Sequence, residues 1–155
     1  LGNIAIASAF VFVVLGLYQL IKRKSLFKID FDIYLIALFY VIVGITYIVF
    51  DKIVINYRPV ILEGELEVAF PSSHTMIVMC LMGFGIHQVV YRISSKKLRL
   101  LLMIACISIM SITVIGRLIS GVHWFTDILG GVFISSAYIF TYLSIFKYIA
   151  YRKNK

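Results

Sequence analysis

Five long apolar runs constrain this chain more than any other feature of its sequence. A membrane-spanning helix needs about 17–25 predominantly apolar residues, and each run is close to that length. The runs extend over Ile4–Ile21, Ile33–Phe50, Thr75–Tyr91, Leu100–Gly116 and Trp124–Phe146. Of the 155 residues, 62% are hydrophobic and only 14% are charged, so the chain is far more apolar than a soluble domain. We therefore predict an all-α polytopic membrane helical bundle with five spans, forming one domain over residues 1–155.

Basic residues between the runs predict the orientation of the bundle. Twelve of the fifteen lysines and arginines fall into three clusters, which alternating spans place on one side of the membrane. The clusters are Lys22, Arg23, Lys24 and Lys28; Arg92, Lys96, Lys97 and Arg99; and Lys147, Arg152, Lys153 and Lys155. Because positively charged loops stay in the cytoplasm, this side is predicted to be cytoplasmic. Topology thus explains the net charge of +8, and we expect no nucleic-acid partner.

The same orientation places Leu1 outside the cell. A further span that starts in the cytoplasm and precedes Leu1 would give the ordinary arrangement. We therefore expect the domain to lack an N-terminal span here and to have six spans in the full-length protein. We expect a multi-pass protein of the cell membrane, surrounded by membrane lipids; nothing in the sequence indicates an oligomeric state.

Three basic residues break the positive-inside pattern and lie at the predicted outer ends of the spans. They are Lys52, Arg58 and Arg117. That side carries three polar stretches, residues 52–59, 70–75 and 116–127. Lys52 and Arg58 belong to the first stretch and Arg117 to the third. Arginine presents a planar fork that suits phosphate oxygens, and lysine adds a point charge. This concentration of cations on one face predicts an anion-binding site.

The third stretch contains a histidine and a carboxylate four residues apart. If the fifth span is helical from about His123, Asp127 shares its face. A carboxylate there can accept a hydrogen bond from one imidazole nitrogen and leave the other as a basic lone pair. This spacing predicts a histidine that acts as a nucleophile or base.

The second stretch reads Phe-Pro-Ser-Ser-His-Thr and opens the third span. A proline followed by two serines suits the start of a helix, where a hydroxyl can cap and free amides can bind an anion. His74 then lies in the first turn, where it could give a proton to a bound phosphate ester.

These stretches resemble the three motifs of the type 2 phosphatidic acid phosphatase family, which are integral membrane lipid phosphatases related to vanadium haloperoxidases. The family patterns are Lys-x6-Arg-Pro, Pro-Ser-Gly-His and Ser-Arg-x5-His-x3-Asp. Arg117, His123 and Asp127 match the third pattern in spacing, with Gly116 in place of its first serine. In the second pattern Ser73 takes the glycine position.

The first motif departs from the family pattern. Arg58 and Pro59 match it, but Lys52 is one residue too close to them, and Asp51 occupies the lysine place. Asp51 could pair with either Lys52 or Arg58, and the sequence leaves both pairings open.

The resemblance implies a role for each matched residue. His123 would attack phosphorus and form a phosphohistidine, Asp127 would orient it, and His74 would protonate the leaving group and then activate water. The phosphate oxygens would be held by Lys52, Arg58, Ser72, Ser73 and Arg117. We expect no metal and no other cofactor.

Several residues near these stretches have a structural interpretation instead. His87 lies toward the cytoplasmic end of the third span, where we expect it to pack in the bundle. Gly130 and Gly131 predict close helix packing in the fifth span. The acidic residues Glu63, Glu65 and Glu67 are interpreted as a solvated loop, although they could also favour a polar headgroup or bind a cation.

The sequence therefore predicts a metal-independent lipid phosphatase whose site faces the cell exterior. Candidate substrates by resemblance are undecaprenyl pyrophosphate, phosphatidylglycerol phosphate, phosphatidic acid and diacylglycerol pyrophosphate, with the polyprenyl pyrophosphate the first to test. One alternative is a lipid phosphotransferase, which the motifs do not separate from a hydrolase. Another is a transporter. Transport paths place polar residues deep along several spans, whereas here they concentrate at the outer ends of the spans, so this alternative is disfavoured.

Overall fold

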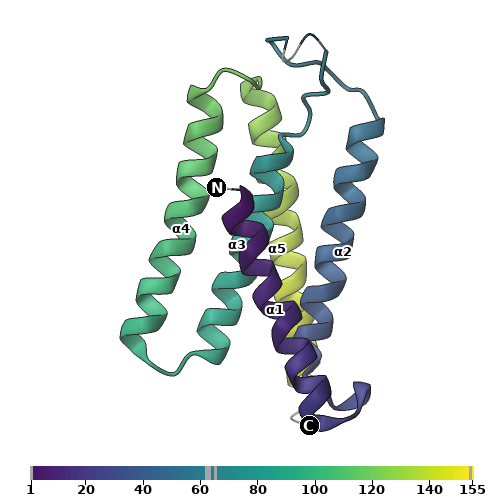
Figure 1. Cartoon of the computed structure of the whole chain (residues 1–155), viewed down its shortest axis with the longest axis vertical. Helices are drawn as coiled ribbons and strands as arrows, with labels where there is room; N and C mark the ends of the chain where they lie inside the picture. Colours follow the sequence, from purple (N-terminus) through teal and green to yellow (C-terminus); the bar gives the residue numbers. More distant parts are fainter. Residues whose placement is uncertain (1, 62–63, 65, 154) are drawn as a thin grey trace.

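The computed structural model of the chain is a bundle of helices that run alternately in opposite directions (Figure 1). It describes residues 2–61, 64, 66–153 and 155. The helices are α1 (Gly2–Arg23), α2 (Phe31–Lys52), α3 (Ser73–Arg92), α4 (Lys96–Ile119) and α5 (Phe125–Lys153), with a short 3-10 helix, η1 (Leu26–Lys28), before α2. Each predicted apolar run coincides with one helix, which confirms the prediction of an all-α bundle.

Four of the helices, α2 to α5, are long and apolar enough to cross a membrane, judged on the part of the chain that the structure describes. The chain is therefore a multi-pass membrane protein. Helix α1 has 22 residues, and at 1.5 Å per residue its length is about that of the hydrocarbon layer. Its predicted role as a fifth span stays a prediction.

Helix α3 lies at the centre of the bundle and has more buried residues than any other helix among those described. Its Cys80 and Phe84 pack against Phe39 of α2 and Tyr142 of α5. Helices α3 and α5 approach closely at Gly83. A Cβ atom at this position would lie 2.4 Å from Cδ1 of Ile139 in α5, so the Ile139 side chain would have to shift to admit it. Close approach at small residues is the usual way in which membrane helices gain contact area.

Helix α4 packs on the other side of α3 and leaves most of its surface exposed. Its Cys106, Ile109 and Met110 contact the Val78–Met82 part of α3. Thr113 is its only buried residue among those described, and Leu101, Ile104 and other large apolar side chains point outward. In a membrane these side chains face lipid, which is as apolar as they are.

A network of charged and polar side chains lies at the end of the bundle where α1 ends and α2 begins. Arg92, in the last turn of α3, donates hydrogen bonds to Asp32 and to Gln88, and its Nη1 is 3.5 Å from Oδ2 of Asp30. Asp30 also accepts a bond of 2.8 Å from Gln19 of α1. Arg92 was interpreted from the sequence only as a topology signal. In the structure it links α3 directly to α2, and through Asp30 to α1.

The opposite end of the bundle carries the polar stretches predicted to be functional. The α2–α3 connection and the α4–α5 turn lie beside each other there (Figure 1). The three basic clusters lie at the other end, with Arg23 closing α1, Arg92 closing α3 and Lys153 closing α5. The spans therefore separate the predicted site from the basic clusters, as the sequence predicted.

Candidate active site

Two loops that are distant in sequence are held together by hydrogen bonds at this end. Nε1 of Trp124 donates to the carbonyl oxygen of Tyr57 at 2.9 Å. The amide of Ser72 donates to the carbonyl oxygen of Asp127, also at 2.9 Å. Because these bonds join all three polar stretches, the motifs form a single site.

Arg117 lies between the two histidines of the site. Its Nη2 is 3.2 Å from Nδ1 of His74 and 3.2 Å from Nε2 of His123. A guanidinium group can only donate hydrogen bonds, so both imidazole nitrogens act as lone-pair acceptors. The remaining proton of a neutral His123 is thereby assigned to Nδ1, and Nε2 keeps the lone pair that a nucleophile needs.

Asp127 is fully buried behind His123. Its Oδ2 lies 3.6 Å from Nδ1 of His123 and accepts a hydrogen bond of 2.9 Å from the amide of Trp124. The distance to the imidazole is longer than a hydrogen bond, and such catalytic contacts commonly tighten when substrate binds. The carboxylate therefore faces the nitrogen opposite the lone pair, as an orienting group would.

Helix α5 begins at Phe125 and not at His123, which differs from the expectation of a helix through both residues. Trp124 takes the position before the first helical residue, and the Asp127 carboxylate reaches back to its amide. This is the acidic half of a capping box. The two residues therefore meet because a capped turn folds His123 over the start of α5.

The electrostatic surroundings lower the pKa of His123 below its usual value. The largest cause is burial of the imidazole, and the positive charges of Arg117 and Arg58 add to it, while Asp127 acts in the opposite direction. Burial and neighbouring cations both disfavour the protonated ring. His123 is therefore held neutral, in the form that can attack an electrophile.

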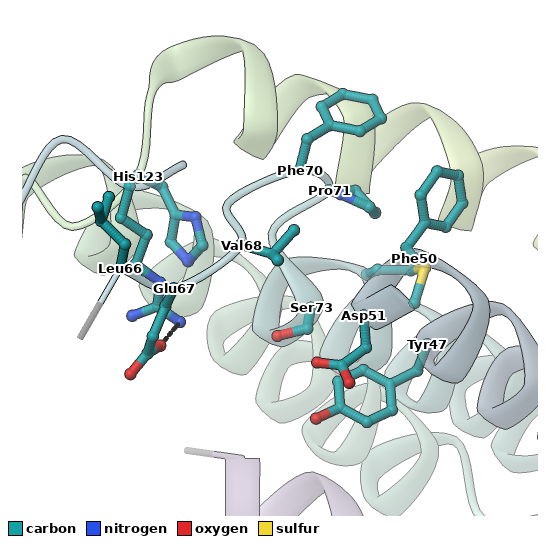
Figure 2. A pocket seen from close by; sticks show the side chains of 12 residues that line it. Tyr47, Phe50, Asp51, Leu66, Glu67, Val68, Phe70, Pro71, Ser73 and His123 are labelled. Carbon is teal, nitrogen blue, oxygen red and sulfur yellow. Dashed lines mark ion pairs between the residues drawn. The ribbon is translucent and has the colours of Figure 1, made fainter. Parts of the chain in front are cut away.

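A cavity of about 320 Å³ opens beside His123. In the view of Figure 2, His123 and Glu67 lie at one end, Asp51 and Tyr47 lie at the other, and Ser73 lies between them. Of the eight predicted site residues, Arg58, Ser73 and His123 line this cavity.

Two arginines at the site keep a nitrogen without a partner. Nε of Arg58 and Nε of Arg117 are both buried and have no hydrogen-bond partner among the described residues. The Arg58 side chain is 13% exposed, and its Nη2 pairs with Oε2 of Glu67 at 2.8 Å. Buried donors of this kind require acceptors, and phosphate oxygens would supply them.

Lys52 and Ser72 are two of the five predicted residues that do not line the cavity. The Lys52 side chain is 79% exposed and lies 3.6 Å from Asp51, which settles the pairing that the sequence left open. Asp51, in the family's lysine position, lines the cavity in its place. Ser72 is fully buried, and its hydroxyl accepts a hydrogen bond of 3.1 Å from Thr75. Ser72 is the N-cap of α3, but its side chain makes no capping bond.

Sequence reasoning missed two residues of the site. Asn56 donates a hydrogen bond of 2.9 Å from Nδ2 to Oδ1 of Asp127, and no local pattern marks an amide whose partner is distant in sequence. Glu67 was noted as one of three acidic loop residues, but its pairing with Arg58 was not expected. The other two, Glu63 and Glu65, lie outside the described residues.

The glycine pair of α5 packs against the loop that carries the second motif. A Cβ on Gly130 would lie 2.4 Å from the ring of Phe70, and one on Gly131 would lie 3.0 Å from the carbonyl oxygen of Ser72. The prediction of close packing at these glycines is confirmed. Their small size lets α5 approach the start of α3 and brings Ser73 and His74 close to His123.

Comparisons with known proteins identify the fold and the family of the chain. A crystal structure described as the first transmembrane PAP2 type phosphatidylglycerolphosphate phosphatase from Bacillus subtilis matches with a TM-score of 0.68 and 22% sequence identity, covering 96% of this chain and 77% of that chain. At this identity the likeness shows the fold. A comparison with curated proteins gives no match. The model of the PAP2 superfamily matches residues 52–151, which is more than half of the sequence and contains all eight predicted site residues. The chain therefore belongs to the PAP2 superfamily, as the three motifs predicted.

Proposed function

We propose that this protein is a lipid phosphatase in which His123 attacks the phosphorus atom of a lipid phosphate or pyrophosphate. One observation carries the proposal: Nη2 of Arg117 lies 3.2 Å from a nitrogen of both His74 and His123, beside a cavity that His123 lines. Two histidines and a cation that converge on one point suit phosphoryl transfer, which depends on positioning and on charge stabilisation.

The reaction would proceed in two balanced steps. Nε2 of His123 forms a bond to phosphorus while the bond from phosphorus to the leaving oxygen breaks, and protonated His74 gives its proton to that oxygen. Water then attacks the phosphohistidine, His74 takes a proton from it, and the phosphorus–nitrogen bond breaks to release phosphate. Arg58 and Arg117 would neutralise the negative charge on the phosphoryl oxygens.

The other predicted residues would complete the phosphate site. The backbone amide and hydroxyl of Ser73 belong to the first turn of α3 and lie at the cavity, where a helix start favours an anion. Ser72 would hold a phosphate oxygen from its position at the N-cap of α3. Lys52 would join only by turning from Asp51, and its long stem permits this.

A lipid substrate fits the position of the site. The cavity lies at one end of the apolar helices, so a headgroup could enter it while the lipid chains remain beside the exposed faces of the spans. The basic clusters lie at the opposite end, and the positive-inside rule then favours an outer location for the site. The matched Bacillus subtilis protein is described as a phosphatidylglycerolphosphate phosphatase, and this lipid was already a candidate beside polyprenyl pyrophosphate, phosphatidic acid and diacylglycerol pyrophosphate.

Phosphate release tests the proposal directly. The full-length protein, purified in detergent, is incubated with each of these lipids in the presence of a metal chelator. We expect release by the wild type and none by His123→Ala. His87→Gln is the matched control, because His87 contacts Tyr142 in the bundle and lies away from the cavity.

Each outcome is informative. Equal release by wild type and His123→Ala would exclude His123 as the nucleophile. Release that stops in chelator would exclude a metal-independent reaction. Phosphate transferred to another lipid or alcohol, with no free phosphate, would identify the protein as a phosphotransferase.

A further inference from the structure

The carboxylate of Asp127 has a second partner that no motif of the family pattern describes. Nδ2 of Asn56 donates to its Oδ1 at 2.9 Å, while Oδ2 faces His123 and accepts from Trp124. The two oxygens of the carboxylate are thus divided between two tasks. Asn56 fixes one oxygen, and the other accepts from the Trp124 amide and faces the imidazole of His123.

We propose that Asn56 is a positioning residue that holds the Asp127 carboxylate in the plane from which it orients His123. The proposal rests on the proposed function, because it assigns Asn56 a part in the reaction of His123. Asn56 itself does not line the cavity; it acts through its hydrogen bond to Asp127.

Asn56 is held in place by its own backbone. Its carbonyl oxygen accepts a hydrogen bond of 3.0 Å from the amide of Ala69. The next residue, Tyr57, forms an antiparallel bridge with Val68, and its carbonyl oxygen accepts from Trp124. The amide is therefore presented to Asp127 from a short paired segment, which is more rigid than a free loop.

The orientation of the Asn56 amide follows from its surroundings. Its Oδ1 is buried and has no partner among the described residues. Reversing the amide would point Oδ1 at the Asp127 carboxylate and replace a hydrogen bond with a repulsive contact. Only the donor orientation is compatible with Asp127. An amide also carries no charge, so it orients the carboxylate without adding to the field at His123.

Two substitutions separate positioning from simple packing. Asn56→Ala removes the donor. Asn56→Asp keeps the shape but places a second carboxyl group about 2.9 Å from the first, and two carboxylates this close cannot both be ionised without strong repulsion. When this pair holds one proton, the new carboxyl donates the same hydrogen bond and the net charge equals that of the wild type. When the proton leaves, the bond is replaced by repulsion.

The titratable and charged groups around this pair come from every neighbouring element. They are His74 on α3, Arg117 on α4, His123 in the α4–α5 turn, and Arg58 and Glu67 in the α2–α3 connection. Wild type and variants share all of them. Dividing the activity of a variant by that of the wild type at each pH therefore removes the part of their titration that the substitution leaves unchanged.

The experiment measures kcat and KM for lipid phosphate hydrolysis between about pH 5.5 and about pH 8, a range in which such a carboxyl pair can lose its proton. We expect Asn56→Ala to lower kcat by about 10²-fold, the cost of a misplaced catalytic group, with little change in KM and at every pH. We expect the activity of Asn56→Asp relative to wild type to rise as the pH falls. Tyr57→Phe changes an exposed ring in the same segment and is the matched control, expected to match the wild type.

Several outcomes would overturn the proposal. One is kcat within threefold of wild type for both variants. Another is a pH-independent loss in Asn56→Asp, accompanied by a fall in thermal stability, which would mean that Asn56 only packs. If the wild type hydrolyses no lipid, the proposed function fails, and nitrogen NMR of the three histidines decides the positioning role. Asn56→Ala, which adds no charge, must then lower the pKa of His123, because Asp127 acts to raise that pKa, and an unchanged titration would reject the positioning role.

Discussion

Glu67 holds Arg58 through both its side chain and its main chain. Oε2 of Glu67 lies 2.8 Å from Nη2 of Arg58, and its carbonyl oxygen accepts a hydrogen bond of 3.0 Å from the Arg58 amide. The Glu67 carboxylate is thus paired with Arg58, the cation that we propose binds phosphate. A bound phosphate would have to share Arg58 with Glu67 or displace it.

We expect Glu67→Gln to strengthen inhibition by vanadate or inorganic phosphate. The main-chain bond keeps Arg58 in place, while the competing negative charge is lost. Exposed ion pairs are worth about 0.2–1 kcal/mol, so the inhibition constant should fall by up to about fivefold, and by less at high salt. Leu66→Ala, a neighbouring change without charge, is the control. Weaker inhibition in Glu67→Gln would show instead that the carboxylate orients Arg58 for binding.

Removing Arg117 should lower activity and change its dependence on pH. Arg117 contributes to the lowered pKa of His123, after burial, so Arg117→Ala should raise that pKa. More of the imidazole is then protonated and lacks its lone pair at a given pH. The acidic limb of the kcat/KM profile should therefore move to higher pH. Loss of one positioned hydrogen-bond donor should also lower kcat by about 10²–10³-fold.

Arg117→Lys separates the two effects. It keeps a positive charge near His123 but loses the guanidinium fork, so its rate should fall while its acidic limb stays close to that of the wild type. An acidic limb that does not move in Arg117→Ala would mean that the arginine charge does not act on His123.

Gly131→Ala should harm both stability and activity. The new Cβ would meet the Ser72 carbonyl oxygen at 3.0 Å and the Met76 amide nitrogen at 3.2 Å, and backbone atoms cannot rotate away. Overpacking of this kind costs about 1–3 kcal/mol and would push the start of α3 from His123. Gly44→Ala in α2 is the control, because nothing lies within 4 Å of its Cβ position. Thermal unfolding, followed through labelling of the buried Cys80 thiol, would measure the difference. Equal unfolding temperatures would contradict the packing argument.

The Asp32–Arg92 pair should support the fold without affecting the chemistry. The Asp32 side chain is 1% exposed and the Arg92 side chain 24%, so Asp32→Ala leaves a partly buried cation whose remaining partners are the neutral Gln88 and the more distant carboxylate of Asp30. Breaking a buried pair costs about 3–5 kcal/mol. We expect a lower unfolding temperature with unchanged kcat per folded molecule, while Lys97→Ala, at the same end but exposed, should change neither. A fall in kcat of the folded Asp32→Ala protein would show coupling between the two ends of the bundle.

The sequence was sufficient to predict the helices and the end of the bundle at which the three polar stretches meet. Helices and closed barrels are the structures that can cross a membrane, and a continuous apolar run as long as Ile33–Phe50 fits a spanning helix rather than a shorter barrel strand. His74, Arg117, His123 and Asp127 could be grouped because alternating spans bring their stretches to one end. The PAP2 match to residues 52–151 confirms the family on which their roles depend, and the roles themselves stay proposals.

Side-chain pairings across long sequence distances could not be predicted. The approach of Asn56 to Asp127 depends on the turn that the α2–α3 connection takes, and no periodic pattern encodes that turn. The pairing of Arg58 with Glu67 depends on the same antiparallel register. Arg92 was accounted for by topology alone, so its burial against Asp32 had no visible signal.

One carboxylate, that of Asp127, closes the first turn of α5 and also faces His123, the proposed nucleophile. Selection for a more durable enzyme and selection for a faster one therefore act on the same atoms. A library that varies Trp124 or Asp127 to improve the helix start would alter turnover, and one that varies them for a new substrate would loosen the bundle. Engineers who want to separate the two properties should leave this turn untouched and search the exposed faces of α4 instead.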